Sequence, residues 1–224
     1  MAGLWVVIPG YQAEARIGAV VDGALAHGLP VVVVDDGSRD RTAEAATAAG
    51  AIVVRHPSNR GKGAALQTGF AVAGRAGAAG VLTLDADGQH DPAELPRLIA
   101  AHDQAPEALI IGVRDFDAGM PGRSRFGNRF STWWISRFTG RPHRDTQSGF
   151  RVYPRRLYAE TSLRTSRFDT ETELLLWAAK RGVPLVEVPI RTIYHADDQS
   201  THFHNFDDSV RIVLLVVGSP FWRG

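Results

Sequence analysis

The chain has 224 residues, of which 44% are hydrophobic and 22% charged, and this composition predicts one globular domain and excludes an intrinsically disordered chain. With 25 basic and 24 acidic side chains the formal charge is +1, so bulk electrostatics argue against nucleic acid as a partner. The absence of cysteine excludes disulfides, cysteine-ligated zinc, iron–sulfur clusters and thiol nucleophiles.

In the first half, short β-branched runs alternate with alanine-rich helical stretches. We expect strand 4–8, helix 14–27, strand 31–34, helix 40–49, strand 51–54, helix 63–76 and strand 81–84. This alternation predicts an α/β fold with a mostly parallel sheet and helices on both faces. Asp91 before Pro92 predicts a helix N-cap, and three glycines predict helix C-caps: Gly28, Gly50 and Gly182.

The second half starts with a strand at 109–113, followed by an arginine-rich and aromatic segment at 121–144. Further on we expect a helix at 170–181, strands at 185–188 and 190–194, and an amphipathic helix at 206–217.

Signals for secretion or membrane insertion are not evident in the sequence. Residues 1–10 lead straight into an apolar segment without the basic start and cleavage site of a signal peptide. Near the other end, residues 212–217 form an apolar run far shorter than the roughly 18 to 20 residues that cross a bilayer. We therefore expect a cytoplasmic protein that does not span a membrane.

Acidic side chains follow two of the expected strands, where ligands bind in open parallel sheets. Asp85 and Asp87 are two residues apart, so in extended geometry both carboxylates leave on the same side and could reach one Mg²⁺ or Mn²⁺. The alternative is an Asx turn with solvated carboxylates. Asp35 and Asp36 are adjacent and point in opposite directions, so one could accept hydrogen bonds from a nucleobase or ribose while the other holds the following turn.

Lys62 lies between two glycines at the entrance of an expected helix, a position that suits a phosphate. The surrounding sequence is not a Walker A loop, because that motif needs glycine six residues before the lysine and none stands there.

Five ordered stretches, IPGY at 8–11, VDDGS at 34–38, NRGKGAA at 59–65, DADGQH at 85–90 and DTQSGFR at 145–151, carry a family resemblance. Together they resemble the family 2 glycosyltransferases with the GT-A fold, closest to the polyprenyl-phosphate (dolichol-phosphate-like) mannosyl- and glucosyltransferase branch. The resemblance implies a single domain over 1–224, with a nucleotide-sugar-binding half at 1–113 and an acceptor-binding half at 114–224. It also implies inversion at the anomeric carbon.

The resemblance, together with the motifs, assigns site residues. We expect donor contacts from Pro9, Tyr11, Glu14, Asp35, Asp36, Lys62, Asp85, Ala86 and Asp87. We expect metal contacts from Asp85, Asp87, Gln89 and His202. The family usually reads Tyr-Asn-Glu, whereas here two other residues separate tyrosine from the acid, Glu14.

Catalytic groups are expected in the second half: Asp145, Gln147, Arg151 and Glu171. Arg151 and Lys62 could stabilise the departing diphosphate. A phosphate acceptor is already anionic near pH 7 and needs no base, whereas a hydroxyl acceptor needs a carboxylate, for which Asp145 is the first candidate and Glu171 the second. The alternatives are a loop cap for Asp145 and a helix-dipole role for Glu171.

Arginines alternate with aromatic residues between 123 and 138. A buried amphipathic helix would explain this pattern, but we favour an interfacial element that makes peripheral contact with the cytoplasmic face of a membrane. We expect its arginines to hold acceptor or membrane phosphates, and the acceptor-binding residues to be Arg123, Arg125, Arg129 and Ser148.

These observations predict a metal-dependent (Mg²⁺ or Mn²⁺), inverting transfer of a hexose from a nucleoside-diphosphate sugar, UDP-glucose or GDP-mannose, to polyprenyl phosphate or another lipid-linked acceptor. The alternatives are a sugar-phosphate nucleotidylyltransferase and a non-catalytic nucleotide-binding module. The first would normally have a glycine-rich basic loop after the first strand, where this chain has Pro9-Gly10-Tyr11-Gln12.

Overall fold

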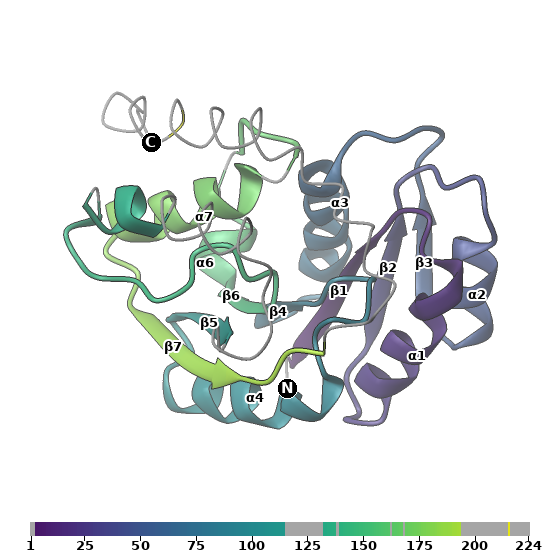
Figure 1. The fold of residues 1–224 in the computed structure, drawn as a ribbon, viewed down its shortest axis with the longest axis horizontal. Helices are drawn as coiled ribbons and strands as arrows, with labels where there is room; N and C mark the ends of the chain where they lie inside the picture. Colours follow the sequence, from purple (N-terminus) through teal and green to yellow (C-terminus); the bar gives the residue numbers. More distant parts are fainter. Residues whose placement is uncertain are drawn as a thin grey trace.

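A seven-stranded mixed sheet forms the centre of the computed structural model, which describes residues 3–114, 132–137, 139–161, 163–167, 169–193 and 215 (Figure 1). The elements in chain order are β1 (Leu4–Gly10), α1 (Glu14–Leu25), β2 (Val31–Asp35), α2 (Thr42–Ala48), β3 (Ile52–Arg55), α3 (Lys62–Arg75), β4 (Gly80–Thr83), the 3₁₀ helix η1 (Pro92–Glu94), α4 (Leu95–Gln104), β5 (Leu109–Arg114), β6 (Arg151–Pro154), α6 (Arg155–Tyr158), α7 (Asp169–Lys180) and β7 (Leu185–Ile190).

The strand order across the sheet is β3-β2-β1-β4-β6-β5-β7. β6 runs antiparallel to both of its neighbours, and the other pairings are parallel. The carboxyl ends of six strands therefore lie at one edge of the sheet, and β6 begins at that same edge. We refer to it below as the carboxyl edge.

Side chains that alternate along β1 divide the core into two layers. Leu4, Val6 and Ile8 pack with apolar residues of α1, α2 and α4 on one face of the sheet. Val7 points to the other face and packs with residues of α3, α6 and α7. Figure 1 shows the two groups of helices on either side of the strands. The expected α/β fold, with a mostly parallel sheet covered on both faces, is confirmed.

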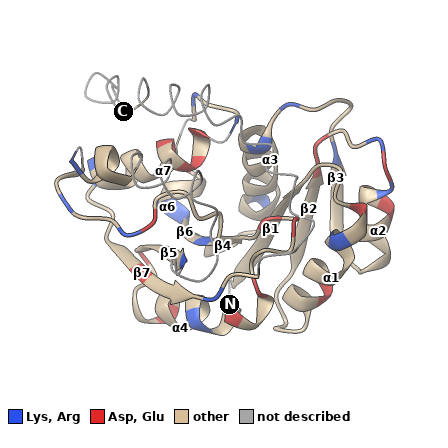
Figure 2. Ribbon diagram, viewed as in Figure 1, with Lys and Arg blue, Asp and Glu red and all other residues tan. Residues whose placement is uncertain are grey.

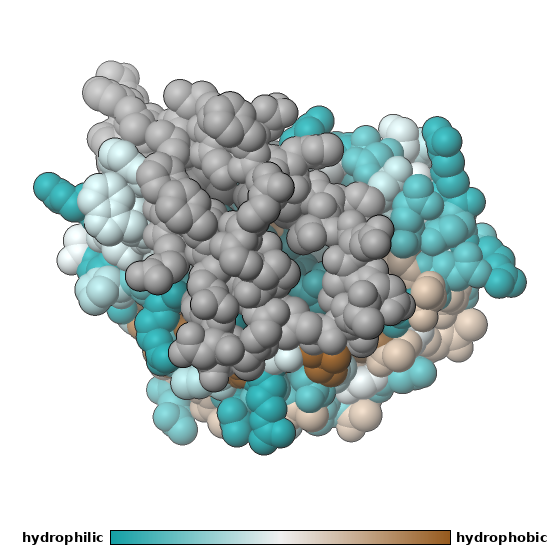
Figure 3. All heavy atoms as spheres, in the orientation of Figure 1, coloured by the Kyte–Doolittle hydropathy of each residue, from teal (hydrophilic) through white to brown (hydrophobic). Residues whose placement is uncertain are grey.

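Most expected elements are present, and their end signals act as predicted. Asp91 Oδ1 accepts a hydrogen bond from the Ala93 amide at the start of η1. The C-cap glycines all have positive φ angles: Gly28 +72°, Gly50 +96° and Gly182 +63°. Described residues on the face seen in Figure 3 are mostly hydrophilic, as expected for a surface.

The second half differs from expectation in two ways. The expected pair of strands at 185–188 and 190–194 is one strand, β7, which continues through Pro189 because it pairs with β5 along its whole length. A further strand, β6, was not expected from its four residues, which include an arginine and a proline. The expected helix at 206–217 lies outside the described residues except for position 215.

Candidate active site

Residues from both halves of the chain meet at the carboxyl edge. β4 ends at Thr83, two residues before Asp85, and α3 begins with Lys62. The segment that leads into β6 arrives at the same place: a Cβ atom added to Gly149 would collide with the Asp85 carboxylate. This contact joins the DADGQH and DTQSGFR motifs, which are far apart in the sequence.

Lys62 lies between two carboxylates. Its Nζ is 2.6 Å from Asp85 Oδ1 and 3.3 Å from Glu171 Oε2. Figure 2 shows the basic start of α3 beside the acidic start of α7, consistent with the contact between these helices. Although burial alone would lower the pKa of Lys62, the two carboxylates raise it above its ordinary value.

The two carboxylates of this cluster respond differently to their surroundings. Burial opposes ionisation of Asp85, but Lys62 and His90 outweigh it and lower the pKa of Asp85 to about 2. Burial raises the pKa of Glu171, and Lys62 offsets only part of that effect. Asp85 is the more exposed, with 25% of its side chain accessible against 7% for Glu171. It is therefore ionised and reachable by a ligand.

The Asp85–Asp87 segment is a turn rather than a strand, so the expected same-side arrangement of extended residues does not apply. Asp87 Oδ1 accepts a hydrogen bond from the Gln89 amide at 2.9 Å, which is the Asx-turn geometry. The His90 imidazole accepts a hydrogen bond from the Asp85 amide at 3.3 Å. Burial lowers the pKa of His90 to about 4, so its ring is neutral and can accept this bond.

The ligand atoms that this loop offers fit a hard divalent cation. Asp85 and Asp87 are both partly exposed and offer carboxylate oxygens. Mg²⁺ is usually held by one or two carboxylates, with substrate phosphates and waters completing the shell. Among the described residues, no three His, Asp or Glu side chains lie close enough to hold a metal ion together.

Asp35 and Asp36 are both buried and bonded within the chain. Asp35 Oδ1 accepts from the Ser38 amide at 2.9 Å, which is the turn-holding role expected for one of the pair. Asp36 Oδ1 is 2.7 Å from His56 Nδ1, and the carboxylate also accepts from the amides of Arg60 and Gly61. Because neither carboxylate is exposed, the expected nucleobase contact would need these bonds to rearrange.

The remaining donor candidates lie at the ends of β1 and β4. Pro9 and Tyr11 are partly exposed at the carboxyl edge, whereas Ala86 is buried. Glu14 has another partner: its carboxylate accepts from Arg41 Nε at 2.7 Å and from the Arg41 amide at 3.1 Å. This pair links the starts of α1 and α2.

Asp145 is not placed as a general base. Its side chain is fully buried and accepts two hydrogen bonds from the guanidinium of Arg114, at 2.7 and 3.2 Å. The Gln147 amide binds the same carboxylate at 3.0 Å. With its oxygens so occupied, Asp145 organises the turn, while Gln147 remains partly exposed.

Arg151 and Ser148 also differ from expectation. Arg151 is fully buried, and its guanidinium donates to the backbone carbonyls of Ser148, Thr146 and Glu171 at 2.7 to 2.8 Å. It therefore holds the turn against α7 and does not face a diphosphate. Ser148 is also fully buried, and its hydroxyl accepts from the Phe150 amide, so it does not face an acceptor.

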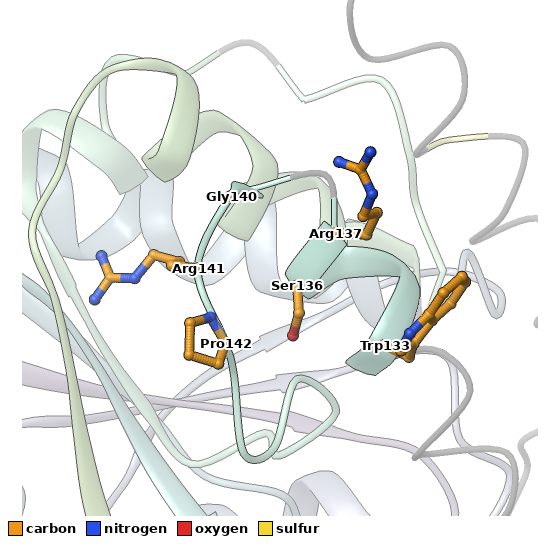
Figure 4. A pocket seen from close by; sticks show the side chains of 6 residues that line it. All are labelled: Trp133, Ser136, Arg137, Gly140, Arg141 and Pro142. Carbon is orange, nitrogen blue, oxygen red and sulfur yellow. The ribbon is translucent and has the colours of Figure 1, made fainter.

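Other expected contacts lie outside the described residues: Arg123, Arg125, Arg129 and His202. Of the aromatic segment, residues 132–137 are helical; Ile135 is buried and Trp133 is 59% exposed. An open hollow of about 380 Å³ lies beside them, lined by Trp133, Ser136, Arg137, Gly140, Arg141 and Pro142 (Figure 4). Of the helices described, none is both long and apolar enough to cross a bilayer.

Three residues near the site were not singled out from the sequence. Arg114 follows the apolar run of β5 and acts electrostatically on both Asp85 and His90. Its position directly after an apolar run is the signal in the sequence that indicates it. His56 and His90 are buried. His56 bonds Asp36, which lies 20 positions away, so residue type and local pattern alone do not indicate that bond. His90 bonds the Asp85 amide within its own loop.

Comparison with known proteins matches this chain to a family and to named relatives. Residues 5–166 match the family described as glycosyl transferase family 2. The chain is 30% identical over 216 residues to UDP-N-acetylglucosamine–dolichyl-phosphate N-acetylglucosaminyltransferase of Methanococcus voltae, covering 85% of this chain and 86% of that protein. It is 31% identical over 205 residues to polyprenol monophosphomannose synthase of Mycolicibacterium smegmatis, covering 83% and 75%.

A similar solved structure is glucosyl-3-phosphoglycerate synthase from Mycobacterium tuberculosis in complex with Mn²⁺, UDP-glucose and phosphoglyceric acid. It superposes with a TM-score of 0.78 at 20% identity, covering 100% of this chain and 81% of that one. At that identity the likeness concerns the fold.

Proposed function

We propose that this glycosyltransferase, which belongs to glycosyl transferase family 2, transfers a hexose from UDP-glucose or GDP-mannose to polyprenyl phosphate or another lipid-linked phosphate. The names of the two sequence relatives, which include dolichyl phosphate and polyprenol, support an acceptor of this class. The observation that carries the proposal is the meeting of Lys62, Asp85 and Glu171 at the carboxyl edge.

In this proposal the diphosphate of the donor lies over the DADGQH loop. Asp85, Asp87 and Gln89 would hold Mg²⁺ or Mn²⁺, with His202 as a further candidate. When bound, the ion neutralises negative charge that develops on the leaving diphosphate. Pro9 and Tyr11 flank the nucleoside, and the cationic side chains of Lys62 and Arg114 strengthen the positive field at the same edge.

The two carboxylates expected as bases are already engaged with other side chains, which favours a phosphate acceptor because it needs no base. Asp145 is bound by Arg114, and Glu171 is buried beside Lys62. A phosphate monoester has a second pKa of about 6, so near pH 7 it is mostly a dianion and attacks without a base. Its oxygen would bond to the anomeric carbon as the bond to the diphosphate oxygen breaks, which inverts the configuration.

The hollow beside Trp133 supports a further part of the proposal, a contact with a membrane surface. Arg137 and Arg141 line it, and both side chains are exposed. An exposed indole beside arginines is typical of interfacial segments, in which the aromatic ring lies at the headgroup level and the cations bind phosphates. We propose peripheral contact with a membrane through the element at 123–138, of which 132–137 are described.

The test is incubation of the protein with each donor, Mn²⁺ or Mg²⁺, and either polyprenyl phosphate or the corresponding free polyprenol. We expect release of nucleoside diphosphate with the phosphate acceptor only, and a glycolipid of inverted anomeric configuration. Release of pyrophosphate would instead indicate a nucleotidylyltransferase. Nucleotide binding without product would indicate a binding module.

A further inference from the structure

Lys62 occupies the carboxylate that the proposed metal ion would need. Its ammonium group is 2.6 Å from Asp85 Oδ1, so a divalent ion at that oxygen would lie close to the ammonium charge and repel it. Glu171 Oε2 already lies 3.3 Å from the same nitrogen. An ammonium group has three donors, so a small movement of the lysine from one carboxylate to the other needs no new partner.

Glu171 has unused capacity to receive the lysine. Among the described residues, its Oε1 has no hydrogen-bond partner although the atom is buried. A buried unsatisfied oxygen costs free energy, which closer approach of a cation would offset. The Glu171 side chain is only 7% exposed, so solvent does not readily supply that partner.

We propose that Lys62 is a built-in cation that neutralises Asp85 until metal and diphosphate bind, and that Glu171 is the positioning residue that then receives it. This inference rests on the proposed function, because it takes Asp85 as a metal ligand. Glu171 acts here through Lys62 rather than on the acceptor. Metal ions should accordingly bind weakly to the free protein, because they compete with the lysine.

Binding of Mn²⁺ alone, followed by electron paramagnetic resonance, tests this competition without any turnover. We expect Lys62→Met to bind Mn²⁺ about tenfold more tightly or better than wild type, which corresponds to about 1.4 kcal/mol. Glu171→Gln should bind it more weakly, because Lys62 then pairs with Asp85 alone. A simple structural role for the pair would not move these two affinities in opposite directions.

The chain has only two lysines, and the other one, Lys180, is exposed at the end of α7. Lys180→Met is therefore the matched control, and its Mn²⁺ affinity should equal that of wild type. Wild-type protein labelled with ¹³C at the lysine ε-carbon gives a measurement that needs no variant. On addition of Mg²⁺ and UDP, the Lys62 signal should shift while the Lys180 signal stays in place.

The Asp85→Asn variant separates the two possible failures. If it loses Mn²⁺ binding while Lys62→Met binds no more tightly than wild type, the role given to Lys62 is overturned and the metal site stands. If Asp85→Asn binds Mn²⁺ as wild type does, the metal assignment itself is wrong, and this inference fails with it. An unmoved Lys62 signal at saturating Mg²⁺ and UDP would likewise overturn the lysine movement.

Discussion

Gly149 lies so close to Asp85 that a methyl group has no room between them. An ideal Cβ at this position would be less than 3.0 Å from the Asp85 Cγ and from both carboxylate oxygens. Gly149→Ala must therefore displace the Asp85 side chain or the backbone of the 145–150 turn. Movement of the Asp85 side chain separates it from its present partners, and movement of the turn changes the surface that Asp85 contacts.

The expected cost can be worked from these contacts. Displacement of Asp85 breaks its ion pair with Lys62, whose side chain is 15% exposed. A hydrogen bond to a charged group contributes about 1.5–3 kcal/mol, and partial solvent access places this pair near the lower value. Replacing glycine returns about 0.4–1 kcal/mol by restricting the unfolded chain. The net loss of unfolding free energy is about 1 kcal/mol, which leaves the protein folded.

Activity should fall much further than stability. A misplacement of about 1 Å in a catalytic group can lower the rate about 100-fold. The assay compares urea unfolding with the initial rate of nucleoside diphosphate release for Gly149→Ala and Gly18→Ala. Gly18 lies within α1 with no atom within 4 Å of an added Cβ, so alanine there should stabilise the protein by about 1 kcal/mol and leave the rate unchanged. A wild-type rate for Gly149→Ala would refute the placement of Asp85 in the reaction.

Three further outcomes are expected. Gly69→Ala puts a Cβ into the Val7 side chain and should lower the unfolding free energy by about 1 kcal/mol, even after the gain in helix propensity. A higher unfolding free energy in urea denaturation would contradict this packing. Asp145→Asn leaves the largely buried Arg114 without its counter-charge and should cost about 3 kcal/mol in the same measurement, whereas a loss below about 1 kcal/mol would show that the pair is not structurally important. Burial lowers the pKa of His90 from 6.5 to about 4, so the folded state favours the neutral ring; its contribution to stability is complete above pH 6.5 and is lost as pH falls toward 4. Wild type should therefore lose about 2 kcal/mol more than His90→Gln between pH 7 and pH 5, and equal losses would contradict the neutral buried ring.

The sequence predicted the elements whose signals are local. The apolar runs of β1, β2 and β4 and the glycine caps could be read directly, because strand alternation and a positive φ angle depend on a few neighbouring residues. β6 could not be read in this way. Its residues, Arg151–Pro154, form a strand because β4 and β5 both pair with them, and neither partner is a sequence neighbour.

In the candidate site, too, local motifs could be predicted from the sequence and contacts between distant segments could not. The DADGQH motif identified the loop at 85–90, and the GKG motif identified Lys62. The pairing of Lys62 with Glu171, however, joins residues 109 positions apart. The bond between Arg114 and Asp145 spans 31 positions, and it changes Asp145 from a candidate base into a structural carboxylate. Such pairings depend on which segments meet in space, and residue type alone does not specify them.

The reversed direction of β6 has a consequence for how this molecule can diversify. β5 leaves the sheet at Arg114 and β6 re-enters at Arg151, and both points lie on the same rim. The excursion between them can therefore lengthen, shorten or change composition while the seven-stranded register stays intact. Loops that join the parallel strands β1 to β4 each connect two strands of the sheet through a helix and have less freedom. If these loops hold the nucleotide sugar as proposed, the acceptor preference can change in evolution while the nucleotide-binding part is preserved.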